Sequence, residues 1–88
     1  MANFMGGSAP AMANQIAEGF ILVSQATLKG YTPGDLASLK AELEKLQREV
    51  RSEVPAQDDA QANQARNRKI GRLNAAVQLV QHKMTARH

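Results

Sequence analysis

The residues of this chain whose type and spacing best suit chemistry are four cations within seven positions of its last third: Arg66, Arg68, Lys69 and Arg72. Cations that project from one surface bind phosphate groups, and helical hairpins can present them to duplex RNA or DNA. Arg68 and Arg72 are four residues apart and would share one face of a helix. One interpretation of the cluster is therefore a polyanion-binding surface.

The second interpretation is that the four cations form the charged, solvated side of a helix. They would then pair with acidic residues across a hairpin, namely Glu42, Glu44 or Glu49, or with a neighbouring subunit. No aromatic residue lies near the cluster to stack on bases, and no helix-turn-helix motif frames it. The formal net charge is only +3. We therefore place internal pairing first and nucleic-acid binding second.

Catalytic or metal chemistry finds little support in the sequence. The only histidines are His82 and His88, near the C-terminus, and no carboxylate follows at a ligand spacing. The glycines fit neither a P-loop nor a dinucleotide-binding pattern. We predict a protein that is not an enzyme, with no catalytic residues, metal or cofactor and no small-molecule substrate.

The composition indicates a single all-helical domain. At 88 residues the chain is near the size at which one core is only marginally sufficient. Two Phe, one Tyr and no Trp leave an aliphatic core, and period-2 strand patterns are absent. The absence of cysteine agrees with a cytoplasmic location. The longest purely apolar run covers residues 20–23, too short to span a membrane.

Helix start and stop signals divide the chain into three helices. Ser8 precedes the first, Thr32 with Asp35 forms a capping box at the second, and Pro55 separates the second from the third. Gly30, after Lys29, is the predicted end of the first helix. The predicted helices span residues 9–28, 33–54 and 57–86, in a single domain over residues 8–88 that follows a flexible leader over residues 1–7.

Apolar residues at 3-4 spacing predict that the second and third helices form an antiparallel, coiled-coil-like hairpin. Charges at i,i+4 spacing accompany the seam of the second helix as the pairs Lys40/Glu44, Glu44/Arg48 and Lys45/Glu49. The third helix offers only alanines to the partner before Ile70, so the far end of the hairpin should be thin. The predicted hairpin core consists of Leu36, Leu39, Leu43, Leu46, Val50, Ile70, Leu73, Val77 and Val80.

The predicted first helix carries one charge, Glu18, and is apolar over most of its circumference. Two partner helices cannot cover such a surface, so we expect it also to contact a second copy or another protein. The candidate interface residues are Ile16, Phe20, Ile21, Leu22, Val23 and Leu28.

Together these features predict a three-helix bundle that oligomerises. The expected function is a non-enzymatic small helical adaptor or structural subunit, acting through self-association and helix-mediated protein–protein interaction. The alternatives are a nucleic-acid-binding helical hairpin that uses the cluster of the third helix, and a small regulator or inhibitor of one protein target.

Overall fold

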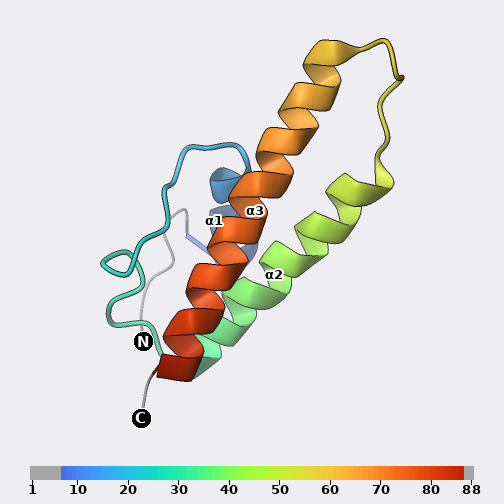
Figure 1. Cartoon of the computed structure of the whole chain (residues 1–88). Coiled ribbons are helices and arrows are strands. Elements are labelled where there is room, and N and C mark those ends of the chain that lie inside the picture. The colour runs from blue at the N-terminus through green and yellow to red at the C-terminus, as the bar shows by residue number, and fades with distance from the viewer. Residues whose placement is uncertain (1–6, 87–88) are drawn as a thin grey trace.

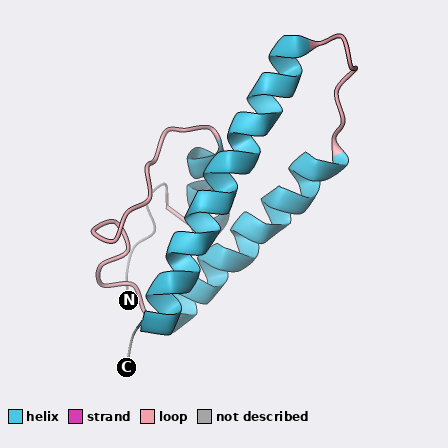
Figure 2. Ribbon diagram, viewed as in Figure 1, coloured by secondary structure: helices cyan, strands magenta, loops and turns pink. Residues whose placement is uncertain are grey.

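A computed structural model describes residues 7–86 of the chain as three helices connected by two loops (Figure 1). The helices are α1 (Ala9–Ala17), α2 (Pro33–Ser52) and α3 (Ala60–Ala86). No strand occurs among these residues (Figure 2). The all-α, three-helix fold predicted from the sequence is confirmed. The predicted leader lies outside the described residues, apart from Gly7.

The long helices α2 and α3 run antiparallel, side by side, and α1 packs against both of them (Figure 1). The resulting body is elongated, with extents of 48 × 24 × 19 Å. The N-terminal half of α2 and the C-terminal half of α3, with α1 against them, form what we call the base of the hairpin. The loop of residues 53–59 and the helix turns next to it form its tip.

Both predicted N-terminal caps are present. The Ser8 hydroxyl accepts a hydrogen bond from the Ala11 backbone N–H at 3.2 Å. Thr32 and Asp35 form the reciprocal capping box: each side chain accepts a hydrogen bond from the backbone N–H of the other at 3.1 Å. These bonds satisfy N–H groups that have no partner within the helix.

The first helix ends at Ala17, so its predicted span of residues 9–28 is wrong. Gly19 has a positive φ of 85°. The N–H of Gly19 bonds to the Ile16 carbonyl at 3.1 Å and the N–H of Phe20 bonds to the Gln15 carbonyl at 2.8 Å. This pair of bonds is a Schellman C-cap, which needs a glycine-like residue in the left-handed conformation. The apolar residues 20–23 then continue without helical structure.

The segment of residues 18–32 folds back over the base instead of extending α1. Ile21, Leu28 and Tyr31 anchor it, since each is at most 8% exposed. The Tyr31 hydroxyl lies 3.4 Å from the sulfur of Met12 on α1. The loop is therefore held by its own apolar side chains.

The predicted core positions differ in burial along the hairpin. The fully buried ones lie at the base, and Leu46, Val50 and Val77 are partly buried and pack against this core. Ile70 is also only partly buried. The predicted seam residues with at most 1% exposure are Leu36, Leu39, Leu43, Leu73 and Val80.

The tip differs in detail from the sequence prediction. The second helix ends at Ser52, not residue 54, and the third begins at Ala60, not residue 57. The carboxylate of Asp59 accepts a hydrogen bond from the Ala62 N–H at 3.0 Å and so caps α3. Asp59 also places an acidic side chain at the N-terminus of α3, where it complements the helix dipole.

Candidate interaction surfaces

Arg66, the first cation of the cluster, is bound to the end of α2. Its Nε donates to the carbonyls of Glu53 at 2.9 Å and Val50 at 3.2 Å, and its Nη2 donates to the carbonyl of Arg51 at 3.2 Å. The last carbonyls of a helix have no partner within it, and a cation near them also complements the helix dipole. Arg66 therefore caps α2 and holds the tip closed.

Arg72 and Lys69 are bound to the end of α1, Arg72 to a backbone carbonyl and Lys69 to a carboxylate. Nη1 of Arg72 donates to the Ala17 carbonyl at 3.1 Å. Nζ of Lys69 lies 3.0 Å from Oε1 of Glu18. Gly19 lies directly against the Arg72 guanidinium, because a Cβ at this position would lie 2.9 Å from Cζ. Both cations therefore attach α3 to the turn that ends α1.

Arg68 differs from the other three cations. It is exposed, and its side chain makes no hydrogen bond or ion pair with any residue in the range 7–86. The predicted partners Glu42, Glu44 and Glu49 pair with none of the four, because Arg66 and Arg72 bind carbonyls and Lys69 binds Glu18. The cluster therefore consists of three cations with structural contacts and one that faces solvent.

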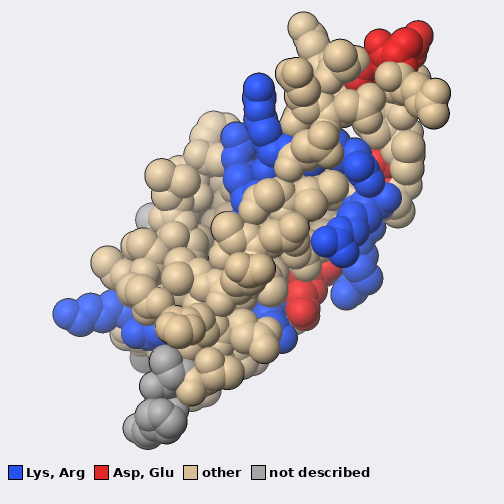
Figure 3. Space-filling model, viewed as in Figure 1, with Lys and Arg blue, Asp and Glu red and all other residues tan. Residues whose placement is uncertain are grey.

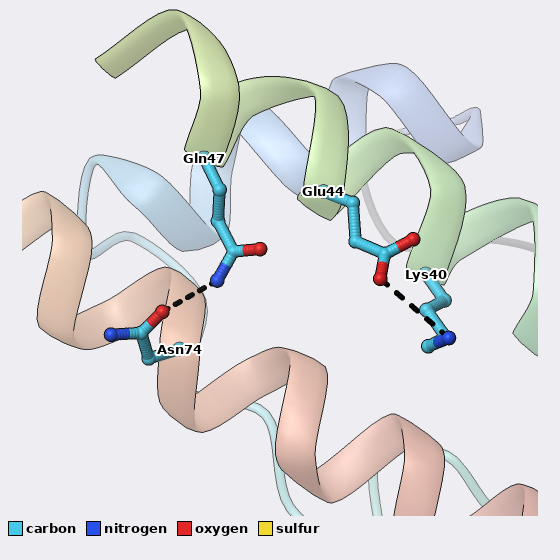
Figure 4. A network of polar contacts seen from close by, with 4 residues as sticks. All are labelled: Lys40, Glu44, Gln47 and Asn74. Carbon is cyan, nitrogen blue, oxygen red and sulfur yellow. Dashed lines mark hydrogen bonds and ion pairs between the residues drawn. The ribbon is translucent and has the colours of Figure 1, made fainter. Parts of the chain in front are cut away.

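Only one of the three charge pairs predicted along the second helix forms. Nζ of Lys40 lies 3.6 Å from Oε2 of Glu44. Figure 4 shows this ion pair beside the hydrogen bond between Gln47 and Asn74, which joins α2 to α3. Arg48 and Lys45 form no ion pair within the described part of the chain, and both are exposed. The C-terminal half of α2 thus presents cations that pair with no residue in the range 7–86.

The predicted oligomer interface is only partly accessible. Ile16, Ile21 and Leu28 are 3%, 7% and 0% exposed, which corrects their assignment as partner contacts. Ile16 is buried on the face of α1 that packs into the core, and Ile21 and Leu28 are buried because the chain turns back after Gly19. Phe20 and Leu22 remain on the surface, 80% and 85% exposed. Val23 is partly buried against the core.

A groove lies beside Leu22, two residues after Phe20. Its volume is about 360 Å³, and Leu22 forms part of its wall. The floor and sides are almost entirely apolar, and Arg72 is the one charged residue among them. We call Phe20, Leu22 and this groove the apolar patch. The groove is lined by Ile16, Ile21, Leu22, Val23, Arg72, Ala75, Ala76 and Leu79.

A second, smaller groove lies at the tip. It encloses about 260 Å³ between Val50 and Pro55 on one side and Ala62 and Ala65 on the other. Arg66 and Lys69 contribute to its wall. Its size follows from the sequence, because alanines do not fill the space between the two helices at this level.

The remaining candidate residues form no site within the described residues. His82 is exposed on α3, and His88 lies outside the described range. Over residues 7–86, no three His, Asp or Glu side chains come together as a metal site would need. None of the three described helices has a long enough apolar stretch to cross a membrane.

Comparison of the chain with protein-family models, with curated proteins and with solved structures found no match.

Proposed function

We propose that the protein is a non-enzymatic helical adaptor or structural subunit that self-associates through the apolar patch. The observation that supports this proposal is the exposure of Phe20 and Leu22, 80% and 85%, beside an apolar groove of about 360 Å³. Exposed apolar side chains that cluster at a groove are typical of interaction sites, whereas scattered ones are normal on any surface.

A second copy of the chain suits this patch because exposed Leu22 forms a wall of the groove and exposed Phe20 is only two residues away in the chain. Two copies related by a two-fold axis can then insert their side chains into each other's groove. An apolar cavity of about 150 Å³ holds a benzene ring. The groove of about 360 Å³ therefore has room for the Phe20 ring of the partner.

The size of the patch sets the expected strength of the contact. A standard interface buries about 800 Å² on each partner, and one aromatic side chain supplies about 150–250 Å² of this. Phe20 and Leu22 form the centre of a small interface. We expect a reversible dimer that dissociates in roughly the micromolar range.

Sedimentation velocity over a range of protein concentrations tests the proposal. We expect the unchanged chain to shift from monomer to dimer, and Phe20→Glu or Leu22→Glu to abolish the shift by placing a charge in an apolar contact. Val54→Glu is the matched control, because Val54 is 78% exposed but lies at the tip. A chain that stays monomeric at every concentration, or equal loss of the dimer in all three variants, would overturn the proposal.

A further inference from the structure

The groove of the apolar patch has a charged end and an apolar end. Arg72 is the one charged residue among those that line it, and it lies at the end nearer the tip. From there toward the base the lining is apolar. The residues that α3 contributes are three and four positions apart and therefore lie on one face of the helix: Arg72, Ala75, Ala76 and Leu79.

The guanidinium of Arg72 keeps donors for a ligand. Nη1 donates to the Ala17 carbonyl at 3.1 Å, and Arg72 makes no other hydrogen bond or ion pair within residues 7–86. Nε and Nη2 carry two parallel N–H groups, the fork with which arginine binds both oxygens of a carboxylate. A Cβ at Gly19 would lie 3.3 Å from Nε and 3.1 Å from Nη2, so glycine leaves the space next to this fork free. Arg72 is exposed, and its fork is available to an anion.

A second guanidinium lies one helical turn nearer the tip. Arg68 is four residues before Arg72, about 6 Å along the axis of α3, and is in line with the face that borders the groove. It is exposed and makes no hydrogen bond or ion pair with any described residue. The nearby carboxylate of Glu18 is paired with Lys69. In Figure 3, Lys and Arg side chains gather over the half of the hairpin nearer the tip, and uncharged side chains cover most of the half nearer the base.

We propose that this groove binds an amphipathic monocarboxylate, a linear aliphatic acid of medium chain length, with its carboxylate on Arg72 and its tail along α3. From Arg72 to Leu79 the helix advances about 10 Å. An extended chain advances about 1.2 Å for each bond, so about eight carbons cover this length. The volume agrees, because a cavity of about 150 Å³ holds the six carbons of benzene and the groove measures about 360 Å³.

The shape of the surface favours a single tail over a lipid bilayer. A membrane-binding surface projects large apolar side chains into the lipid. The α3 side of this groove instead has the small side chains of Ala75 and Ala76, which leave a depression that accepts a chain from outside. A tail in the groove excludes a side chain of a second copy. Ligand binding therefore opposes self-association, but it does not depend on it.

The length of the groove fixes how affinity should change with the length of the tail. Complete burial of one CH2 group strengthens binding about fourfold, so an open groove should give about twofold to threefold for each CH2 from hexanoate to octanoate. Beyond decanoate the tail extends past the groove, and the gain should stop. Octanoate has few atoms, and we expect it to bind with a dissociation constant on the order of 0.1–1 mM.

Isothermal titration calorimetry with sodium octanoate, below the concentration at which it forms micelles, tests the proposal. Phe20→Ser is titrated beside the unchanged chain, because Phe20 does not line the groove and is the side chain proposed to enter a second copy. Octanoate should bind both chains, so the result stands whether or not the protein self-associates. The neutral probe 1-octanol has the same tail and should bind about fivefold more weakly.

Two pairs of variants locate the site. Arg68→Glu reverses a charge beside the carboxylate and should weaken octanoate binding about fivefold. Arg48→Glu makes the same change on α2, which contributes no residue to the groove, and should change binding less than twofold. Ala75→Glu places a carboxylate in the groove and should weaken binding at least about tenfold. Its control is Gln78→Glu, at an exposed position of α3 outside the lining, with an effect below twofold.

Circular dichroism should show unchanged helicity in all four variants, because all four positions are exposed. The proposal is overturned by no octanoate binding at about 5 mM, by octanol binding as tight as that of octanoate, or by equal loss in a variant and its control. It is also overturned if the chain binds phosphatidylglycerol vesicles more tightly than octanoate.

Discussion

At the base of the hairpin Leu39, Leu43 and Leu73 are completely buried, whereas at the tip Val50 is only partly buried and the facing residues are alanines. The base is held by apolar packing among three helices. The tip has two helices and too little apolar volume, and its closure depends on hydrogen bonds from Arg66 to carbonyls of Val50, Arg51 and Glu53. Two ends of one hairpin are thus stabilised by different forces.

This difference explains why the cations of α3 do not act as one cluster. Where apolar packing is insufficient, a long side chain with several N–H donors can bridge helices that smaller side chains do not connect. Arg66 does this at the tip and Arg72 does it at the turn after α1. Arg68 makes no such contact within residues 7–86 and is exposed.

The largest expected effect is the loss of packing at the base. Leu39 is 0% exposed, so Leu39→Ala should lower the free energy of unfolding by about 2–5 kcal/mol. Val50→Ala at the tip should cost only about 1 kcal/mol, because this side chain is already partly in contact with water. Urea unfolding at a fixed protein concentration measures both. Equal losses would contradict the difference between base and tip.

The next effect concerns the turn that ends α1. Gly19→Ala places a Cβ at positive φ and 2.9 Å from Cζ of Arg72, so we expect a loss of about 1–3 kcal/mol. Gly71→Ala is the control, because Gly71 lies within α3 with open space around its Cβ position. It should raise stability by about 0.5–1 kcal/mol. Thermal unfolding of the two variants should therefore shift in opposite directions.

A smaller effect separates the structural cations from the exposed one. Arg66→Ala removes the donors to three carbonyls and should cost about 1–2 kcal/mol. Arg68→Ala should change the free energy of unfolding by less than about 0.5 kcal/mol, as is usual for exposed side chains. If Arg68→Ala proves as destabilising as Arg66→Ala, the division of the cluster is wrong.

The smallest effect is expected at the ion pair between Lys69 and Glu18. Their side chains are 37% and 51% exposed, so solvent screens the attraction. Glu18→Gln should cost at most about 0.5 kcal/mol, and the loss should shrink further in 0.5 M salt. A salt-insensitive loss of more than about 1 kcal/mol would mean that Glu18 stabilises the turn by other contacts.

The sequence predicted those parts of the fold that depend on neighbouring residues. The Ser8 cap and the Thr32–Asp35 capping box are local, and so is the 3-4 spacing of the buried leucines of α2. The end of α1 was also locally encoded, in Gly19, but the apolar residues after it suggested a longer helix. The positive φ at Gly19 shows that the glycine, not the apolar run, determines where the helix stops.

Other features depend on which distant residues meet, and the sequence pattern did not contain them. Arg66 reaches carbonyls 13 to 16 residues earlier in the chain, and Arg72 reaches Ala17, 55 residues earlier. Backbone carbonyls have no residue-type signature, so a search for acidic partners missed both contacts. Likewise, Ile21 and Leu28 are apolar whether they face a partner or fold back into the core.

Native-state hydrogen exchange, read residue by residue, tests the difference between base and tip most directly. Amides of residues 39–43 in α2 and 73–80 in α3 should exchange only through global unfolding, because their turns carry the buried core. Amides of residues 49–52 and 64–67 should exchange through local opening that costs about 2–3 kcal/mol less, and Arg66→Ala should lower that opening energy further. Equal protection along the whole hairpin, unchanged by Arg66→Ala, would contradict this account.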